Sequence, residues 1–178
     1  MDFLELVKAR QSDRSFEISR PVETEKLEYI LEAAQLAPSA CNAQPWKILV
    51  VNEPELAQRI GEAAAGLGMN KFAKDAPVHL LIIEESANFT SMIGSKIKGK
   101  YYPLMDIGIL ASHITLAAEN CGLGSCILGW FDEKKFKQIL GIPSRKRVLL
   151  DIVIGYSAKE KRSKKRKPIS DIISYNKY

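Results

Sequence analysis

Residues 37–51 read APSACNAQPWKILVV and hold the most informative junction in the chain. Before this stretch, the apolar residues of 27–34 recur at helical spacing, and Pro38 disfavours helical geometry in the residue that precedes it. After it, the apolar run 47–51 is typical of a buried strand. The sequence therefore predicts a helix, a short loop fixed at both ends, and a strand.

The loop itself is polar next to an aromatic residue. Ser39, Asn42 and Gln44 precede Trp46, and short side chains that donate and accept hydrogen bonds are suited to holding a flat ligand with polar edges. Such residues are less suited to filling a core. We therefore expect the loop to belong to a binding site.

The loop resembles the Pro-Ser-x-x-Asn-x-Gln-Pro-Trp motif of the nitroreductase family. The members of this family are dimeric FMN-dependent NAD(P)H oxidoreductases. The resemblance implies that the loop contacts FMN and that its residues 38–42 reach the flavin of the other subunit. The residues it assigns to cofactor binding here are Pro38, Ser39, Ala40, Asn42 and Gln44.

A second motif is RQSDR at residues 10–14. In an extended segment, alternate residues point to one side, so Arg10, Ser12 and Arg14 would converge. Two guanidiniums and a hydroxyl form a good anion site, although a solvated basic turn is the plainer interpretation. The family carries the same motif after its first helix, where it binds FMN. A positive charge from Arg14 near the pyrimidine ring would stabilise the reduced anion.

The segment GLGSCILGWF at 122–131 ends one predicted helix and opens a strand. It resembles the family segment whose backbone amides face the flavin N5 atom, with Leu128 and Gly129 at the matching positions. Glycine also lets a backbone approach a flat ligand closely. Family members further have an asparagine and a lysine at the flavin pyrimidine, for which the candidates here are Asn70, Lys71 and Lys74.

The run KRSKKRKP at 161–168 is strongly basic. By composition alone, the charges of 159–167 are typical of a solvated or nucleic-acid-binding surface. The resemblance instead implies that this segment closes on the FMN phosphate through Lys164 and Arg166. No interleaved aromatic residues or recognisable motif support nucleic-acid binding, so that function is kept only as the alternative from another class.

Length and composition favour one domain over residues 1–178, with 46% hydrophobic residues available for a core. The N-terminus lacks the features of a signal peptide and no apolar run approaches membrane-spanning length, so we expect a cytoplasmic protein. Helix and strand patterns alternate, which predicts an α+β domain of three layers, α/β/α. The resemblance adds a mostly antiparallel central sheet and a homodimer.

Two segments are predicted to modify this plan. Residues 85–102 are polar, basic and poor in periodicity, which is typical of a lid over a pocket. Residues 168–178 form a short amphipathic tail that is too small to bury itself and is expected on the partner subunit. His79, inside an apolar run, is interpreted as a hydrogen-bonded core histidine rather than a catalytic one.

The three cysteines do not form a CxxC pair, so the sequence supports neither a disulfide framework nor a structural zinc site. Cys121 and Cys126 could form a redox pair, but buried inert thiols are the commoner case. Cys41 lies in the polar loop. We predict no metal site.

The sequence contains no GxGxxG fingerprint, P-loop or convincing catalytic triad, and we assign no catalytic side chain. An enzyme can lack a conspicuous catalytic side chain if bound FMN carries the electrons. The resemblance implies that NADH or NADPH gives hydride to the flavin N5 and leaves. An electron-poor acceptor such as a nitroaromatic or a quinone then takes its place, giving ping-pong turnover. A flavin-dependent dehalogenase, and a flavin-binding carrier or sensor with little turnover, are the alternatives.

Overall fold

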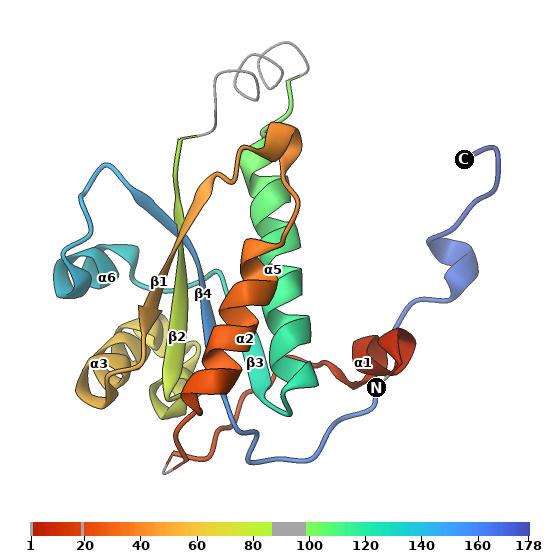
Figure 1. Cartoon of the computed structure of the whole chain (residues 1–178). Helices are drawn as coiled ribbons and strands as arrows, with labels where there is room; N and C mark the ends of the chain where they lie inside the picture. Colours follow the sequence, from red (N-terminus) through yellow and green to blue (C-terminus); the bar gives the residue numbers. More distant parts are fainter. Residues whose placement is uncertain (1, 19, 87–98) are drawn as a thin grey trace.

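The centre of the molecule is a four-stranded sheet in which every neighbouring pair of strands is antiparallel. The computed structural model describes residues 2–18, 20–86 and 99–178. In spatial order the strands are β1 (Trp46–Val51), β2 (Val78–Glu84), β4 (Arg147–Gly155) and β3 (Gly124–Leu128) (Figure 1).

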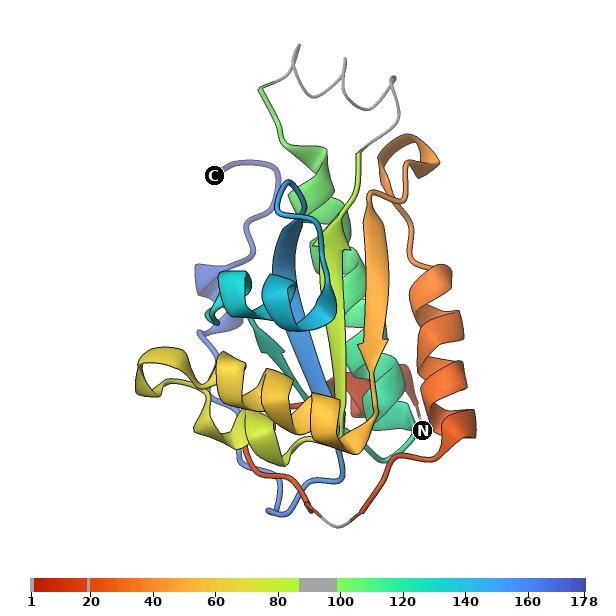
Figure 2. The ribbon, with the colours of Figure 1, turned by 90° about the vertical axis from the view of Figure 1, so that its left-hand side faces the viewer.

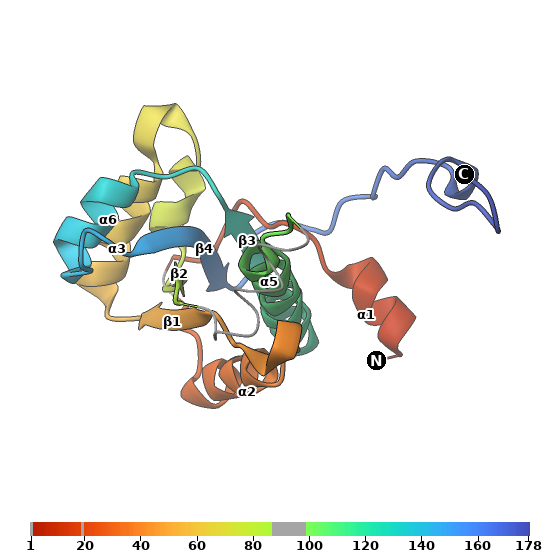
Figure 3. The same cartoon turned by 90° about the horizontal axis from the view of Figure 1, so that it is seen from above.

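Helices cover both faces of this sheet, and the prediction of three layers is confirmed. Seen from above, one pair of helices lies on each side of the strands (Figure 3). Figure 2 views the molecule from the α3 and α6 side. The pairs are α2 (Thr24–Gln35) with α5 (Tyr102–Asn120), and α3 (Pro54–Ala64) with α6 (Glu133–Leu140).

The alternation of side chains along β2 divides the core in two. Leu80 and Ile82 join the cluster under α2 and α5, whereas Leu81 and Ile83 join the cluster under α3 and α6. All four are at most 5% exposed. A strand with helices on both faces must be apolar at consecutive positions, which is why this run could be recognised in the sequence as a buried strand.

The helix boundaries follow from capping residues. The Glu53 carboxylate accepts from two backbone amides at the start of α3, where Pro54 occupies the first turn. α6 begins after Asp132, whose side chain accepts from the Lys135 amide, and ends at Gly141 in the left-handed conformation. α2 ends at Gln35, just before the proline that predicted its end.

The N-terminal segment after α1 (Phe3–Ala9) runs along the far edge of the sheet. The Asp13 amide donates to the Ser125 carbonyl of β3 at 2.9 Å, and the Glu17 amide donates to the Tyr156 carbonyl at 2.9 Å. These bonds bring residues 11–17 beside the chain that leaves β4. Two segments from opposite ends of the sequence therefore become neighbours.

The first helix and the C-terminal tail extend away from the three layers (Figures 1 and 3). α1 buries none of its residues, and the tail contains one short 3₁₀ helix, η4 (Ile169–Asp171). The expected lid at 85–102 falls mostly on residues 87–98, which lie outside the described residues. Within the described ranges, none of the helices has the length and apolar character needed to cross a membrane.

Candidate functional site

A pocket of about 290 Å³ joins the two basic segments that the sequence singled out. We call it the anion pocket. Both of its walls are rich in cations, and no acidic side chain lines it among the residues that the structure describes. One wall comprises Arg10, Gln11, Ser12 and Arg14, and the other comprises Arg162, Ser163, Lys164 and Arg166.

The electrostatics of Lys164 show how closely these charges converge. Burial, with the neighbouring charges of Arg10 and Arg166, lowers the pKa of the Lys164 ammonium below its ordinary value of 10.5. Its Nζ atom also donates to the Val7 carbonyl at 2.8 Å. An anionic ligand would counteract both effects, because its negative charge would favour the charged form of the ammonium.

Arg14 extends this positive field toward β3. Burial raises the pKa of the Cys126 thiol, and the charge of Arg14 acts in the opposite direction. Arg14 is thus close enough to β3 to influence a residue on it. The guanidinium connects the anion pocket with the strand that leads to Gly129.

Gly129 follows β3 and lines a second pocket of about 380 Å³ with Gly66, Trp130, Phe131 and Asp132. A Cβ atom built on Gly129 would meet no atom within 4 Å, so its backbone faces open space. Leu128, in contrast, is 3% exposed and its side chain belongs to the core. Only the backbone of this pair is available to a ligand.

Of the three candidates around residue 70, the structure connects Asn70 directly to this second pocket. Its Nδ2 atom donates to the Trp130 carbonyl at 2.7 Å. Lys71 and Lys74 lie in η3 (Lys71–Asp75), which packs tightly on α3. A Cβ atom at Gly61 would approach the Lys74 Cα to 2.3 Å, so the glycine permits this packing.

The polar loop, which contains η1 (Ala40–Asn42), lies elsewhere. The Ala40 amide donates to Asp106 Oδ1 at 3.1 Å, which attaches the loop to the first turns of α5. The basic run that lines the anion pocket lies at the other end of this helix, because its Lys161 pairs with Glu119 in the last turn of α5. At about 1.5 Å per residue, the helix separates them by roughly 20 Å. The structure therefore does not bring the loop residues together with Arg10, Ser12 and Arg14 in one chain.

Backbone strain marks the loop as a constrained feature. Cys41, Asn42 and Gln44 all have positive φ angles, of 53°, 51° and 45°, which non-glycine residues seldom adopt. Hydrogen bonds within the loop maintain this shape: Ser39 Oγ accepts from the Gln44 amide at 2.9 Å, and the Gln44 side chain donates to Asn42. Strained backbone held by several bonds is common at binding sites.

Comparison with known proteins agrees with this fold. Residues 7–156 match the profile of the Nitroreductase family, which is well over half of the chain. The chain belongs to the nitroreductase family. The predicted family and fold, and with them the expectation of an oxidoreductase, are confirmed.

Individual relatives cover nearly the same extent. An NADH dehydrogenase of Thermus thermophilus is 30% identical over 179 residues, with 86% of each chain covered. An FMN reductase [NAD(P)H] of Bacillus subtilis is 29% identical, over 92% of this chain and 70% of its own length. An FMN-dependent nitroreductase of Clostridium difficile has a similar structure, with a TM-score of 0.77, 29% identity and coverage of 99% and 100%.

Sequence reasoning missed several residues of this nitroreductase-family site. Arg162 belongs to the basic run but was not assigned, and Gln11 lies between two assigned residues; both line the anion pocket. Asp106, a buried residue of the mainly apolar helix α5, was not singled out either. A carboxylate within an apolar run was the signal that could have identified it, because a buried charge needs a partner.

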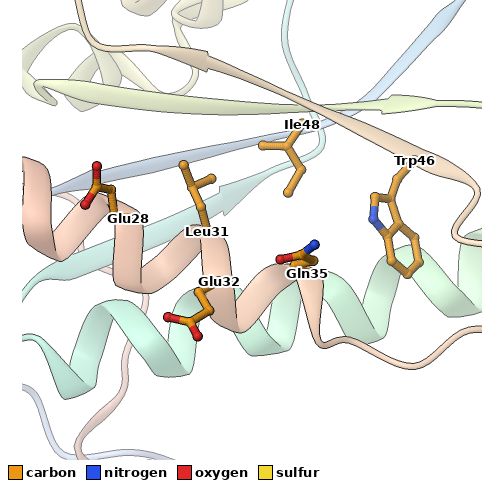
Figure 4. A pocket seen from close by; sticks show the side chains of 6 residues that line it. All are labelled: Glu28, Leu31, Glu32, Gln35, Trp46 and Ile48. Atoms are coloured by element: carbon orange, nitrogen blue, oxygen red, sulfur yellow. The ribbon is translucent and has the colours of Figure 1, made fainter.

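A separate groove of about 440 Å³ lies between α2 and β1 and contains none of the predicted cofactor residues. Figure 4 shows Leu31 on α2 and Ile48 on β1 lining the space between the two elements. The groove is mainly apolar, with carboxylates at its α2 side. Its lining residues are Glu28, Leu31, Glu32, Gln35, Trp46 and Ile48.

The remaining reactive side chains do not form a second active site. His79 is fully buried and its Nδ1 atom lies 2.9 Å from Asp151 Oδ2, as expected for a core histidine. Cys126 packs under α3 and α6 whereas Cys121 packs under α2 and α5, so the sheet separates the two thiols. Among the described residues, no group of histidine, cysteine and acidic side chains could hold a metal ion.

Proposed function

We propose that this nitroreductase-family protein is an FMN-dependent NAD(P)H oxidoreductase whose acceptor is a small electron-poor aromatic compound, such as a nitroaromatic or a quinone. The observation that carries the proposal is the anion pocket, where Arg10, Ser12 and Arg14 meet Lys164 and Arg166. The relatives named for FMN and NAD(P)H support the same cofactor and the same electron donor.

The donor set of the anion pocket fits a phosphate monoester. Guanidinium groups pair with phosphate oxygens through two parallel hydrogen bonds, and a serine hydroxyl adds a neutral donor. A dianion would also offset the burial and the neighbouring positive charges that together lower the pKa of Lys164. Arg10, Ser12, Lys164 and Arg166 would hold the phosphate.

The rest of the site fits a flat ring. Arg14 carries a permanent positive charge toward β3, and Gly129 leaves its backbone open to close approach. Asn70 is held near Gly129 by its bond to the Trp130 carbonyl. Bound FMN would supply the hydride chemistry at N5 that a ping-pong cycle between NAD(P)H and the acceptor requires. Arg14, Gly129 and Asn70 would orient its ring, and Arg14 would stabilise negative charge on its pyrimidine edge.

We further propose that the working unit is a homodimer in which the loop 38–44 of one subunit completes the site of its partner. The loop lies too far from the anion pocket of its own chain to share a ligand with it. Large apolar side chains are also exposed on one helix: Leu104 and Met105 of α5 are 54% and 53% exposed. Exposed apolar patches of this kind mark interfaces.

The tail 168–178 supports a dimer in the same way. Ile169 and Ile172 are 71% and 66% exposed, although they are large and apolar. β1 is an edge strand, and the apolar groove beside it is open. We propose that the partner's tail covers this surface, since an uncovered edge strand invites pairing with another chain.

Visible absorbance tests the function. The purified protein, after addition of FMN and removal of excess, should carry about one flavin per chain, and NADH or NADPH should bleach it. Reoxidation by a nitroaromatic or a quinone would support the proposed acceptor. Flavin that binds but is not bleached would point to the carrier or sensor, and reoxidation by a halogenated aromatic only would point to the dehalogenase.

A colourless protein that does not take up FMN would overturn the proposal. The basic run 159–167 would then be tested for binding to duplex DNA. Binding through phosphates weakens with salt by about 0.9 in log affinity for each neutralised phosphate and log unit of salt. Cytoplasmic location remains a prediction, tested by fractionation of the source cells.

A further inference from the structure

A set of buried and part-buried hydrogen bonds connects the two walls of the anion pocket. Gln11 Nε2 donates to Asp13 Oδ1 at 2.7 Å, and the backbone amide of Arg162 donates to Gln11 Oε1 at 3.0 Å. The Ser157 hydroxyl lies 3.0 Å from the same Asp13 oxygen. We call Gln11, Asp13 and Ser157 the buried bridge.

The two central members of the bridge are removed from water. Gln11 is 7% exposed and Asp13 is 5% exposed. A buried carboxylate is costly unless it is hydrogen-bonded, and here it accepts from two different segments of the chain. Gly124 of β3 allows the close fit, because a Cβ atom there would lie 2.6 Å from Asp13 Oδ2.

Glutamine suits position 11 because the bridge needs a donor at one atom and an acceptor at the other. A glutamate would offer only acceptors, and a lysine or arginine only donors. The two hydrogen bonds also identify which end of the amide is oxygen, since a carboxylate must receive a donor and a backbone N–H must meet an acceptor.

Besides the Gln11 bond, the wall that contains Arg162 has one attachment that leaves the cations of the pocket available, the ion pair of Lys161 with Glu119 of α5. Residues 160–168 form neither helix nor strand. The Arg162 and Lys164 side chains do bond to the Ser12 and Val7 carbonyls, but those bonds occupy the cations themselves. The Gln11 bond holds this wall by its backbone and leaves the charged groups available.

The cations of the pocket favour separation of the walls. Arg10 and Lys164 come from opposite walls, and after burial it is the charge of Arg10 that most lowers the pKa of the Lys164 ammonium. If the pocket is to be formed before the ligand binds, contacts that do not involve an anion must oppose the repulsion between the walls. Preorganisation of this kind improves affinity because less order is lost on binding.

We infer that Gln11 and Asp13 are positioning residues that hold the two walls of the anion pocket in register, and that they determine affinity for the phosphate but not for the ring of the cofactor. The inference rests on the proposed function for the identity of the ligand. The bridge itself and the anion specificity it implies can be tested without a flavin.

The experiment compares FMN with riboflavin, which has the same ring and no phosphate. Gln11→Leu removes both bonds of the amide, and Gln11→Glu places a second carboxylate against Asp13. Each should raise the dissociation constant of FMN about tenfold, as expected for one or two hydrogen bonds, and leave that of riboflavin unchanged. Equal losses for both ligands, or no loss for FMN, would overturn the inference.

Matched variants separate positioning from folding. Asp13→Asn retains a carbonyl acceptor at the same place and should bind FMN nearly as the parent does, whereas Asp13→Leu should behave like Gln11→Leu. Gln138→Leu makes the same substitution on the exposed surface of α6 and should change neither affinity. Losses of FMN affinity with Asp13→Asn equal to those with Asp13→Leu would contradict the role assigned to the acceptor.

Hydrogen exchange keeps this test independent of the proposed function. The Arg162 amide should exchange faster in flavin-free Gln11→Leu than in the parent protein, because it loses its acceptor. Protection of this amide by inorganic phosphate should weaken as well. If the parent binds neither flavin, the proposed function fails; unchanged exchange at Arg162 would instead overturn the buried bridge.

Discussion

The anion pocket and the loop 38–44 were both predicted to bind one cofactor, but the structure builds them differently. Both walls of the pocket come from one chain and meet beside β3 and β4. The loop is fixed to the opposite end of α5 through Asp106, and Asn42 and Gln44, which are proposed to face the ligand, are exposed. The first region has both walls in one chain, whereas the second is an exposed loop at the far end of α5.

This difference indicates which part of the proposed site would need a second subunit. A phosphate can be held by one chain, because its cations converge without help from a partner. The flavin ring would have one side provided by Gly129 and Asn70 and the other by a loop of the partner. Changes in the two regions should therefore differ in which ligands they affect and in which subunit they act.

The largest expected effect comes from the pocket. Replacing Arg10 and Arg166 together by alanine removes two charge-assisted contacts, each worth about 1.5–3 kcal/mol, so FMN affinity should fall roughly 100-fold or more. Riboflavin affinity should stay the same. Fluorescence titration measures both, with Arg59→Ala on exposed α3 as the control. If riboflavin binding falls as steeply, the pocket does not hold the phosphate.

A smaller loss is expected from the loop. Asp106→Ala removes the acceptor for the Ala40 amide, so the strained loop loses its attachment to α5. An unsatisfied buried group costs about 1–3 kcal/mol, and we expect FMN and riboflavin affinity to fall together, about tenfold. Asp106→Asn keeps an acceptor and should be mild. A loss confined to FMN would place the loop at the phosphate instead.

Mixed dimers test most directly whether the loop completes the site of its own chain or that of the partner. In the mixed dimer, one subunit carries the Arg10 and Arg166 substitutions and the other carries Asp106→Ala. If each loop completes the site of the partner subunit, one site has both defects and the other site has none. Titration should then find one tight FMN site per mixed dimer, about half the parent capacity. Two weakened sites and no tight one would show that each chain completes its own site.

The mildest effect is that of pH. The Lys164 ammonium favours a phosphate, and its pKa in the free protein is lowered, so FMN affinity should be constant near neutrality and fall a few-fold as pH rises toward 10.5. A bound phosphate would raise the pKa of Lys164 again. Protonation of Lys164 and binding of FMN therefore favour each other, and FMN affinity decreases as pH rises. Lys164→Arg should abolish the decline, since guanidinium keeps its charge. An undiminished decline in Lys164→Arg would assign the titration to another group.

Local sequence patterns were sufficient for the main elements of the fold. The continuous apolar run at 78–83 identified β2 because a strand covered on both faces has no polar side. Asp132 and Gly141 cap the two ends of α6, and such caps can be recognised locally because they act through neighbouring backbone groups. The resemblance of 37–46 and 10–14 to family motifs indicated the family, and the match over 7–156 confirmed it.

Hydrogen bonds between residues that are far apart in the sequence could not be predicted from local patterns. The bonds of Asp106 to Ala40 and of Gln11 to Arg162 join residues 66 and 151 positions apart. No local spacing encodes such pairs, since they depend on how helices and strands are stacked. Arg162 could be seen as one of several basic residues, but its wall position could not be distinguished from that of its neighbours.

By itself, then, the sequence determined the alternation of helices and strands, the apolar core and the presence of two basic motifs, because these are properties of periodicity, capping and composition along the chain. The tertiary structure decided that the motifs at 10–14 and 162–166 face one another and that the loop 38–44 does not join them. The physical reason is that the sheet edge brings the first two segments together, whereas α5 stands between them and the loop.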